Sequence, residues 1–453
     1  MTETATTTIF DFVPFEPTHQ QAEALYRLSE FLHKDCTADA FVLKGAAGTG
    51  KTSLVKAVVD YLSEQKVCTV LAAPTGRAAK VLGHKTQTLA HTLHHTLYVP
   101  LPHVQKEGEE AIDERVYMRL REIVAGPYSI FVVDEASMLS DQNDDDELFC
   151  TPNSLLHDLL RFVKGCNASS KIVFIGDSYQ LKPIKGESVG LDADYLRNTH
   201  RLDVQEAELT EVKRQDEGSE VLRVATDIRE RYERGAALGK LPLPALGSVW
   251  AALDHYCSSY DPAQIDRIVM IASNHKNVNW FNNYVRNKLG LKGTLAIGDL
   301  VMITKNTIIE QHQIVNGDMA IVAAIHEATK VANLYFRKVT LQLTGYWNET
   351  YTITHQVMVD TLTAENGSIA AEAYRNLIAD RMRQNPIFRN NPRPWNDEFV
   401  GALHLRYGHA LTCHKAQGGE WDEVIMHPWF RANDHRYAYT AITRARKQVL
   451  TWR

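Results

Sequence analysis

The stretch Gly45-Ala-Ala-Gly-Thr-Gly-Lys-Thr52 decides the fold class of this chain. Its spacing is G-x-x-x-x-G-K-[ST], the pattern of a loop whose backbone N–H groups surround phosphate oxygens. An apolar run, residues 40–45 (AFVLKG), precedes it, and residues 52–63 have the pattern of a helix. N–H groups that converge at the start of a helix attract anions, so a phosphate loop needs this strand–loop–helix context. The pattern predicts a nucleoside triphosphate site in an α/β domain.

Each residue of the loop has an expected role. Lys51 should reach the β- and γ-phosphates, and the hydroxyl of Thr52 should hold Mg²⁺. The residues predicted to bind ATP here are Gly45, Ala46, Ala47, Gly48, Thr49, Gly50, Lys51 and Thr52.

Two carboxylates follow a second apolar run, residues 129–133 (SIFVV). A carboxylate at the carboxyl end of such a strand lies beside the phosphate loop in a parallel sheet. We therefore expect Asp134 to bind Mg²⁺ and Glu135 to polarise the attacking water. A pair of surface charges is the alternative, and the apolar strand directly before the pair argues against it.

The remaining strand patterns predict two doubly wound α/β domains. Apolar runs at 67–73 and 171–175 alternate with helical stretches, which is typical of a parallel sheet covered on both faces. A second series begins near residue 205, with strands at 267–272 and 423–427. Between these strands, residues 331–360 alternate polar and apolar residues around a turn at 345–348, the pattern of an antiparallel hairpin.

The predicted domain boundaries follow from these patterns. The first α/β domain is assigned to residues 1–200, with a hairpin insertion at about 95–122. The second α/β domain takes residues 201–305 and 401–453. A small β-rich module is inserted at 306–400, with a helix around 366–384.

Composition limits the class of protein. The chain has 453 residues and a formal net charge of −6, so the whole molecule does not capture nucleic acid by charge alone, although a local basic groove is still possible. The six cysteines contain no C-x-x-C pair, which predicts reduced thiols and no zinc site.

With no signal peptide at the start and no apolar run of spanning length, the chain is expected to be cytoplasmic, in a bacterial cell or a phage-infected host, without contact with a membrane.

Five further stretches narrow the prediction from NTPase to one family. They are 73–80 (APTGRAAK), 176–183 (GDSYQLKP), 209–215 (LTEVKRQ), 410–418 (ALTCHKAQG) and 437–446 (YAYTAITRAR). Taken in this order with the phosphate loop and the Asp-Glu pair, they resemble the motifs of superfamily 1B DNA helicases, nearest to Dda and RecD-like members. The resemblance runs from Thr18 to Trp452. Lys182 departs from it, standing where many members have proline, and the short start predicts that a large N-terminal accessory domain is absent.

The resemblance implies that the two α/β domains are RecA-like motor domains, that the inserted module is a small SH3-like barrel, and that ATP binds in the cleft between the motor domains. Gln21 is similar to the glutamine that reads adenine, although a glutamine early in a helix is more often a surface residue. Asp177 and Gln180 correspond to the γ-phosphate sensor, and Arg214 and Arg444 to the two arginines that stabilise developing charge on the γ-phosphoryl group. For either arginine, a surface ion pair is the alternative. Gly418 completes the predicted ATP-binding set.

The resemblance also implies residues that bind single-stranded DNA. Hydroxyl, amide and backbone N–H groups suit contacts with phosphates that do not depend on sequence, and histidine can stack on a base. The predicted residues are Pro74, Thr75, Arg77, Thr92, His94, Tyr98, Asn274, His275, Thr412, His414 and Lys415. Each of them could instead be a loop or helix-capping residue.

The expected activity is ATP-dependent unwinding of DNA by a monomer that moves 5′ to 3′ on a single strand. The direction comes from the resemblance alone. Single-stranded and fork DNA are the expected partners, with replication or recombination proteins as possible ones. An RNA helicase of the viral superfamily 1 type and a clamp that uses the nucleotide only as a switch remain alternatives. A small-molecule kinase does not explain the second α/β domain.

The segment between His94 and Tyr128 is longer than a connection between neighbouring strands requires. Residues 97–104 are strand-like, Gly108 supplies a turn, and residues 111–118 return, which predicts a projecting hairpin. The resemblance would place this hairpin at the fork as a wedge, with Tyr98 and Tyr117 as the aromatic residues that stack on a splayed base pair. A surface loop with structural tyrosines is the alternative.

Overall fold

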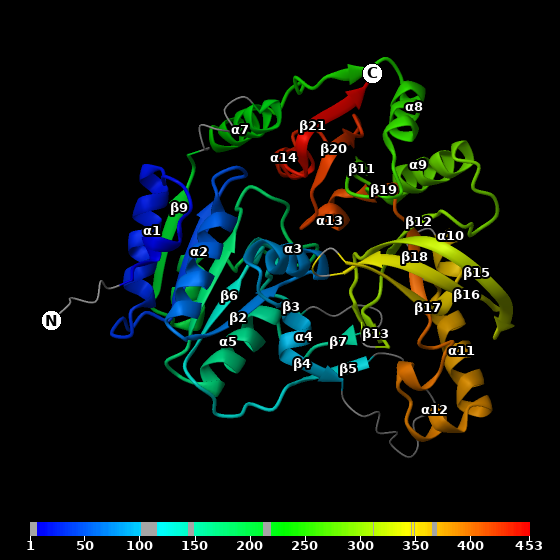
Figure 1. Cartoon of the computed structure of the whole chain (residues 1–453), viewed down its shortest axis with the longest axis horizontal. Helices are drawn as coiled ribbons and strands as arrows, with labels where there is room; N and C mark the ends of the chain where they lie inside the picture. The colour runs from blue at the N-terminus through cyan, green and yellow to red at the C-terminus, as the bar shows by residue number, and fades with distance from the viewer. Residues whose placement is uncertain are drawn as a thin grey trace. The chain divides into compact units, whose positions relative to one another are not determined.

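The computed structural model describes residues 7–100, 116–143, 149–211, 219–310, 312–345, 347, 349–364 and 369–453. These residues form two compact units, with the division between Ala236 and Ala237. Each unit contains one parallel sheet, and the second also contains a closed barrel (Figure 1). The predicted fold class is therefore confirmed.

The first unit is built on a six-stranded parallel sheet in the order β3-β2-β6-β8-β1-β9. Its strands are β1 (Ala40–Gly45), β2 (Cys68–Ala73), β3 (Ala90–Thr92), β6 (Ser129–Val133), β8 (Lys171–Gly176) and β9 (Val204–Leu209). Its helices are α1 (His19–Leu32), α2 (Lys51–Glu64), α3 (Gly76–Thr86), α4 (Leu93–Leu97), α5 (Leu155–Cys166), α6 (Ala193–His200) and α7 (Glu220–Glu233), with 3-10 turns η1 (Ile9–Phe12) and η2 (Ala136–Met138).

Alternating side chains of the strands supply two separate cores in this unit. Phe41 and Leu43 of β1 pack with α1 and α2 on one face, whereas Ala40 and Val42 pack with α5 and α6 on the other. Both faces are therefore covered, which explains why the strands are continuous apolar runs.

A small antiparallel arrangement extends from the first unit. Strand β4 (Tyr98–Pro100) pairs antiparallel with β5 (Val116–Leu120), and β7 (Phe149–Cys150) completes a three-stranded sheet. The antiparallel pair is the base of the predicted hairpin. Its predicted turn, including Gly108, lies outside the described residues.

The second unit holds a five-stranded parallel sheet in the order β10-β21-β20-β11-β19. Its strands are β10 (Ala245–Leu246), β11 (Ile268–Ala272), β19 (Ala410–Thr412), β20 (Trp421–Met426) and β21 (Ala445–Trp452). Its helices are α8 (Val249–Ser259), α9 (His275–Lys288), α13 (Cys413–Ala416) and α14 (His435–Ile442).

The chain leaves this sheet after α9 to form the barrel. The closed barrel contains β12 (Leu300–Ile303), β15 (Met319–Val331), β16 (Leu334–Thr344), β17 (Thr350–Met358) and β18 (Leu403–Tyr407). The hairpin β13 (Thr307–Ile309) and β14 (His312–Ile314) and the helices α10 (Asp360–Thr363), α11 (Ala371–Gln384), α12 (Pro386–Asn390) and η4 (Pro394–Asn396) accompany it. The predicted antiparallel hairpin is the pair β16 and β17.

Two predicted boundaries differ from the sheet topology. The first motor domain was expected to end at residue 200, yet β9 pairs with β1 in the first sheet, and the first unit continues to Ala236. The barrel was expected within 306–400, yet it begins with β12 and closes with β18, on either side of that range. Strand β9 is assigned to the first sheet by its pairing with β1, and β12 and β18 close the barrel by pairing with each other, so in each case the deciding partner lies far away in the sequence.

No helix within the described ranges is both long enough and apolar enough to cross a membrane.

Candidate functional site

The loop between β1 and α2 has the geometry of a phosphate cradle. Gly48 and Gly50 have φ angles of +76° and +83°, in the left-handed region that costs other residues energy. A Cβ added at Gly45 would lie 2.7 Å from Cγ of Lys51, so this position also excludes any side chain. The backbone therefore favours glycine at positions 48 and 50, the side chains of Lys51 and Thr49 favour it at position 45, and the residues present fit a bound triphosphate.

The side chains of the loop bind its own backbone. Nζ of Lys51 donates to the carbonyl oxygens of Gly45 at 2.5 Å and of Ala46 at 2.9 Å. The hydroxyl of Thr49 donates to the carbonyl of Ala46 at 2.8 Å. The ammonium group of Lys51 is thus held over the first residues of the loop, where a phosphate would meet it.

Gln21 fastens the loop to helix α1. Its Nε2 donates to the carbonyl of Thr49 at 2.8 Å, and its Oε1 accepts from the backbone N–H of Thr18 at 3.0 Å. The side chain is 1% exposed. Each end of the amide still has one further hydrogen-bonding position, a second N–H on Nε2 and a second lone pair on Oε1, so the predicted contact with adenine would be made by a side chain that is already bound to the loop.

The predicted carboxylates lie at the same edge of the sheet as the loop. Strand β8 lies between β1 and β6, so their carboxyl ends place the phosphate loop, Asp177 and the pair Asp134-Glu135 in neighbouring positions. Oδ1 of Asp134 accepts from the N–H of Glu135 at 2.9 Å. Glu135 has a φ of +51°, a strained conformation for a residue with a side chain, and such strain is concentrated at functional sites.

The segment after β8 forms a compact turn around Asp177. This residue is fully buried, its Oδ1 accepts from the N–H of Tyr179 at 3.0 Å, and its carbonyl accepts from the N–H of Gln180 at 3.3 Å. Gln180 is 5% exposed. The predicted sensor residues are therefore fixed relative to the end of the strand next to β1.

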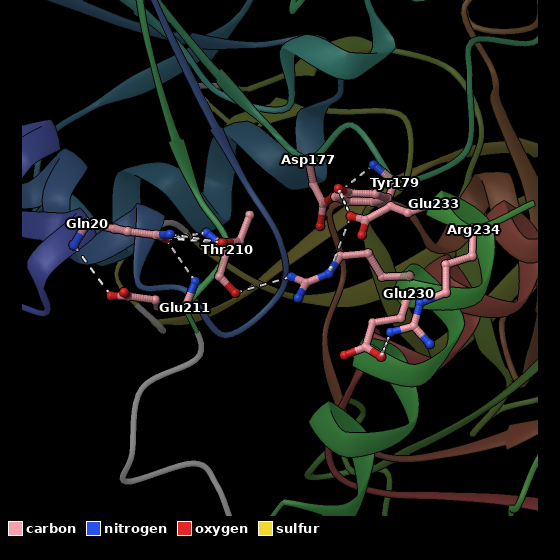
Figure 2. Close-up of polar contacts among 9 residues, drawn as sticks. Gln20, Asp177, Tyr179, Thr210, Glu211, Glu230, Glu233 and Arg234 are labelled. Carbon is pink, nitrogen blue, oxygen red and sulfur yellow. Dashed lines mark hydrogen bonds and ion pairs between the residues drawn. The ribbon is translucent and has the colours of Figure 1, made fainter.

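A polar network, shown in Figure 2, connects this turn with α1, the end of β9 and α7. Oε1 of Gln20 accepts from the N–H groups of Thr210 at 2.7 Å and Glu211 at 3.0 Å. Arg229 of α7 donates to the carbonyl of Thr210 at 3.2 Å, and the hydroxyl of Tyr179 donates to the carboxylate of Glu233. Desolvation, followed by this bond, raises the pKa of Tyr179 well above its usual value.

Helix α7 also reaches the phosphate loop. A Cβ at Gly48 would lie 2.9 Å from both Cδ atoms of Leu222. The sequence patterns did not indicate Arg229, Glu233 or Leu222, because their contacts depend on folding over long sequence separations. Arg214, predicted between β9 and α7, lies outside the described residues.

Arg444 is buried in the second unit. It is 6% exposed and donates to the carbonyls of Thr440 at 3.3 Å and Gly419 at 3.4 Å. The preceding Gly418 has a φ of +73°. The second bond joins the predicted motif 437–446 to the residue directly after the motif 410–418, and the role of Arg444 toward a nucleotide stays a prediction.

Four predicted strand-binding residues are helix caps, arranged in the same way in both units. Thr75 and Asn274 follow β2 and β11 and cap α3 and α9, whereas Thr92 and Thr412 are the last residues of β3 and β19 and cap α4 and α13. Each accepts the N–H of the third residue after it, at distances of 2.9 to 3.4 Å.

The registers of the strand pairs β2–β3 and β11–β19 also match between the two sheets. Ala73 lies opposite Thr92 in the first sheet, and Ala272 lies opposite Thr412 in the second. His94 and His414 each stand two residues after their capping threonine. Thr92 and Thr412 are 6% and 9% exposed, so the histidines and backbone groups beside them are better placed for an external ligand.

One predicted DNA-binding residue is part of the core. Tyr98 is 2% exposed, packs among the residues on the α5 face of the first sheet, and donates its hydroxyl to Asp158 at 2.8 Å. A ring in this position has no free face for a base, so Tyr98 has the structural role that was the alternative reading. The side chain of Tyr117 lies outside the described residues.

A basic group in the second unit consists of Arg406, His275 and Lys415. The sequence patterns indicated only His275 and Lys415. Nη1 of Arg406 donates to Nδ1 of His275 at 2.9 Å, and Nζ of Lys415 donates to Oδ1 of Asn316 at 3.3 Å. Burial, followed by the charges of Arg406 and Lys415, lowers the pKa of His275. Arg406 was missed because it belongs to β18 of the barrel and precedes the recognisable motif.

Comparison with known proteins agrees with this arrangement. The AAA domain family matches residues 18–241, and the UvrD-like helicase C-terminal domain matches residues 407–450. The ATP-dependent RecD2 DNA helicase of Deinococcus radiodurans is 25% identical over 437 residues, which cover 90% of this chain and 46% of that protein. The ATP-dependent DNA helicase dda of Enterobacteria phage T4 is 32% identical over 190 residues, 41% of this chain and 37% of that protein.

This chain is a homologue of the RecD2 and Dda helicases. The predicted resemblance to superfamily 1B is confirmed. The chain spans less than half the length of the curated relatives it matches. Among solved structures, a Bacteroides Pif1 helicase in complex with ADP-AlF3 and single-stranded DNA covers 96% of this chain and 92% of its own, with 16% identity and a TM-score of 0.49.

Proposed function

We propose that this chain is an ATP-dependent DNA helicase that moves 5′ to 3′ on a single strand and unwinds forked duplexes as a monomer. The observation that carries the proposal is the repeated strand edge: Ala73 with Thr92 in one sheet matches Ala272 with Thr412 in the other. Two similar edges suit one strand that is held by both motor domains. Hydrolysis of ATP at a site on the first sheet would then supply the free energy with which the domains change their affinity for the strand.

The residues at the first edge suit hydrolysis of ATP. Gly45 to Thr52 would hold the phosphates, with Lys51 as the cation, while the hydroxyl of Thr52 and the carboxylate of Asp134 would bind Mg²⁺. Magnesium neutralises charge on the phosphate oxygens. Glu135 would orient and deprotonate water, and Gln180 would report the state of the γ-phosphate. Arg214 and Arg444 are the proposed arginines of the transition state.

The residues at both edges suit contacts that do not depend on base sequence. Arg406, His275 and Lys415 would contact phosphates from the second unit, and Pro74, Thr75, Arg77 and His94 from the first. The pair β4 and β5 would carry the wedge for fork DNA. The RecD2 and Dda relatives are named ATP-dependent DNA helicases, which supports DNA as the substrate.

The test is an ATPase assay without nucleic acid, with single-stranded DNA and with RNA of the same sequence. We expect DNA to stimulate hydrolysis more than RNA. Stimulation by RNA alone would favour the RNA helicase, and binding of DNA without any hydrolysis would favour the clamp.

A second assay tests the direction. Duplexes that carry only a 5′ or only a 3′ overhang should be unwound from the 5′ overhang. Unwinding restricted to the 3′ overhang would show that the direction taken from superfamily 1B is wrong for this chain.

A further inference from the structure

Trp429 is the most exposed tryptophan in the part of the chain that the structure describes. Its side chain is 79% exposed, whereas the neighbouring His427 is 7% exposed. Isolated apolar side chains on a surface are common, so exposure alone assigns no role. The position of Trp429 and the way its backbone is held distinguish it from the others.

The position follows from the second sheet. Ile271 of β11 pairs in parallel with Met426 of β20, so the residues after both strands leave from the same edge. The residues after β11 are Ser273, Asn274 and His275, and the last two belong to the proposed strand-binding set. The hydroxyl of Ser273 donates to the carbonyl of Trp429 at 3.3 Å, which places Trp429 directly beside this set.

The backbone of Trp429 is anchored to a cluster of aromatic side chains. Its N–H donates to Nδ1 of His427 at 3.1 Å, and the two rings meet edge to face with centroids 5.9 Å apart. The ring of His427 in turn contacts Trp452 at 4.9 Å and Phe281 at 5.9 Å, and both of these are buried. An exposed indole is thus presented by a backbone that is fixed to the core on its inner side.

We propose that Trp429 is a stacking platform for a base of the single-stranded nucleic acid bound by the second unit. A planar ring with open faces next to phosphate-binding groups is what a base requires, and stacking accepts every base because each has a π-face. The phosphate contacts of Arg406, His275 and Lys415 hold the backbone of the strand, and Trp429 holds a base. This proposal rests on the proposed DNA binding of the chain.

The test compares two strands by fluorescence anisotropy. One is a fluorescein-labelled oligothymidylate of about a dozen nucleotides, within the usual range of site sizes. The other has the same length and label but carries abasic sugars in place of the bases. The variants are Trp429→Ala and Trp429→Phe, with Trp395→Ala as the matched control, because Trp395 on η4 is also 66% exposed but lies between the barrel strands β17 and β18.

Trp429→Ala should weaken binding of oligothymidylate about 5- to 150-fold and leave binding of the abasic strand unchanged. Trp429→Phe should retain most of the affinity, and Trp395→Ala should bind both strands as the wild type does. Unchanged binding of oligothymidylate by Trp429→Ala overturns the proposal, as a tryptophan that docks a protein would behave in this way.

Equal weakening on both strands also overturns it, because Trp429 would then only position the phosphate contacts. If the wild type binds neither strand, the proposed function itself fails, and that result is distinct from a failure confined to the Trp429 variants.

Discussion

Replacing Gln21 with alanine separates two roles that the same residue can have. In the structure, the amide of Gln21 joins the phosphate loop to α1 through Thr49 and Thr18. If Gln21 mainly positions the loop, its loss should affect the stability of the first unit and the binding of every nucleoside triphosphate. If it mainly reads adenine, its loss should affect ATP selectively.

The size of the effect on stability follows from burial. Thr49 is 0% exposed, so in Gln21→Ala its carbonyl loses a donor at a place that water reaches poorly. A buried acceptor without a partner costs about 1–3 kcal/mol. The N–H of Thr18 is only partly buried and regains a water, so it adds little. We expect the free energy of unfolding of the first unit to fall by about 1–3 kcal/mol.

The assay measures urea unfolding together with the dissociation constants of fluorescent ATP and GTP analogues. Gln20→Ala is the matched control, because Gln20 lies on the same turn of α1 but bonds to the part-exposed Thr210. We expect Gln21→Ala to weaken both nucleotides by a similar factor. A variant of wild-type stability that loses affinity for ATP and keeps its affinity for GTP would refute loop positioning and establish adenine reading.

Three further predictions concern catalysis, packing and pH. Glu135→Gln should bind ATP normally but hydrolyse it about 10²-fold more slowly or worse in saturating DNA, and a wild-type rate would show that Glu135 is not the base. Arg286→Ala should destabilise the second unit by about 3–5 kcal/mol in urea unfolding, because it leaves Asp299 charged and fully buried, whereas replacing both residues with apolar ones should cost less. Burial lowers the pKa of His404 and of His409 to about 3, below the value near 6.5 that each has when unfolded, so the free energy of unfolding should decrease as the pH falls from about 6.5 toward 3. The decrease should be up to about 1.4 kcal/mol per pH unit for each histidine, and a His409→Gln variant with the wild-type slope would contradict it.

The parts of the fold that were predicted correctly depend on local patterns. The phosphate loop and the apolar parallel strands each have a signature within about 15 residues, and the β16–β17 hairpin has one within residues 331–360. The boundary after β9 was missed because its burial pattern is mixed, and only pairing with β1, far away in the sequence, assigns it to the first sheet. The same limit applies to β12 and β18, whose closure of the barrel joins residues about 100 positions apart.

The sequence predicted the residue types that form the site better than it predicted the contacts that these residues make. A tyrosine such as Tyr98 has the same letter whether it faces a base or the carboxylate of Asp158, and only the packing of α5 decides which. Arg229 and Arg406 lie on a helix and a strand outside the motifs, so no spacing rule indicates them. A capping residue such as Thr92 is ambiguous in a different way, because the position that caps a helix is also the position that faces the crevice at the end of a strand.

The local electrostatics of the second unit explain how a chain with a negative net charge can bind a polyanion. A formal charge of −6 repels a polyanion at a distance, so binding must come from groups that act at close range. Burial, followed by the charges of Arg406 and Lys415, lowers the pKa of His275, so two cations act on this ring despite the acidic total. Burial and these neighbours disfavour the charged form of His275, whose Nδ1 accepts a hydrogen bond from Arg406 and so orients the guanidinium. The attraction to phosphates therefore depends on few cations. Because each phosphate contact adds to the salt dependence of DNA binding, that dependence should be small in total. Contacts with bases should then contribute a larger share of the affinity.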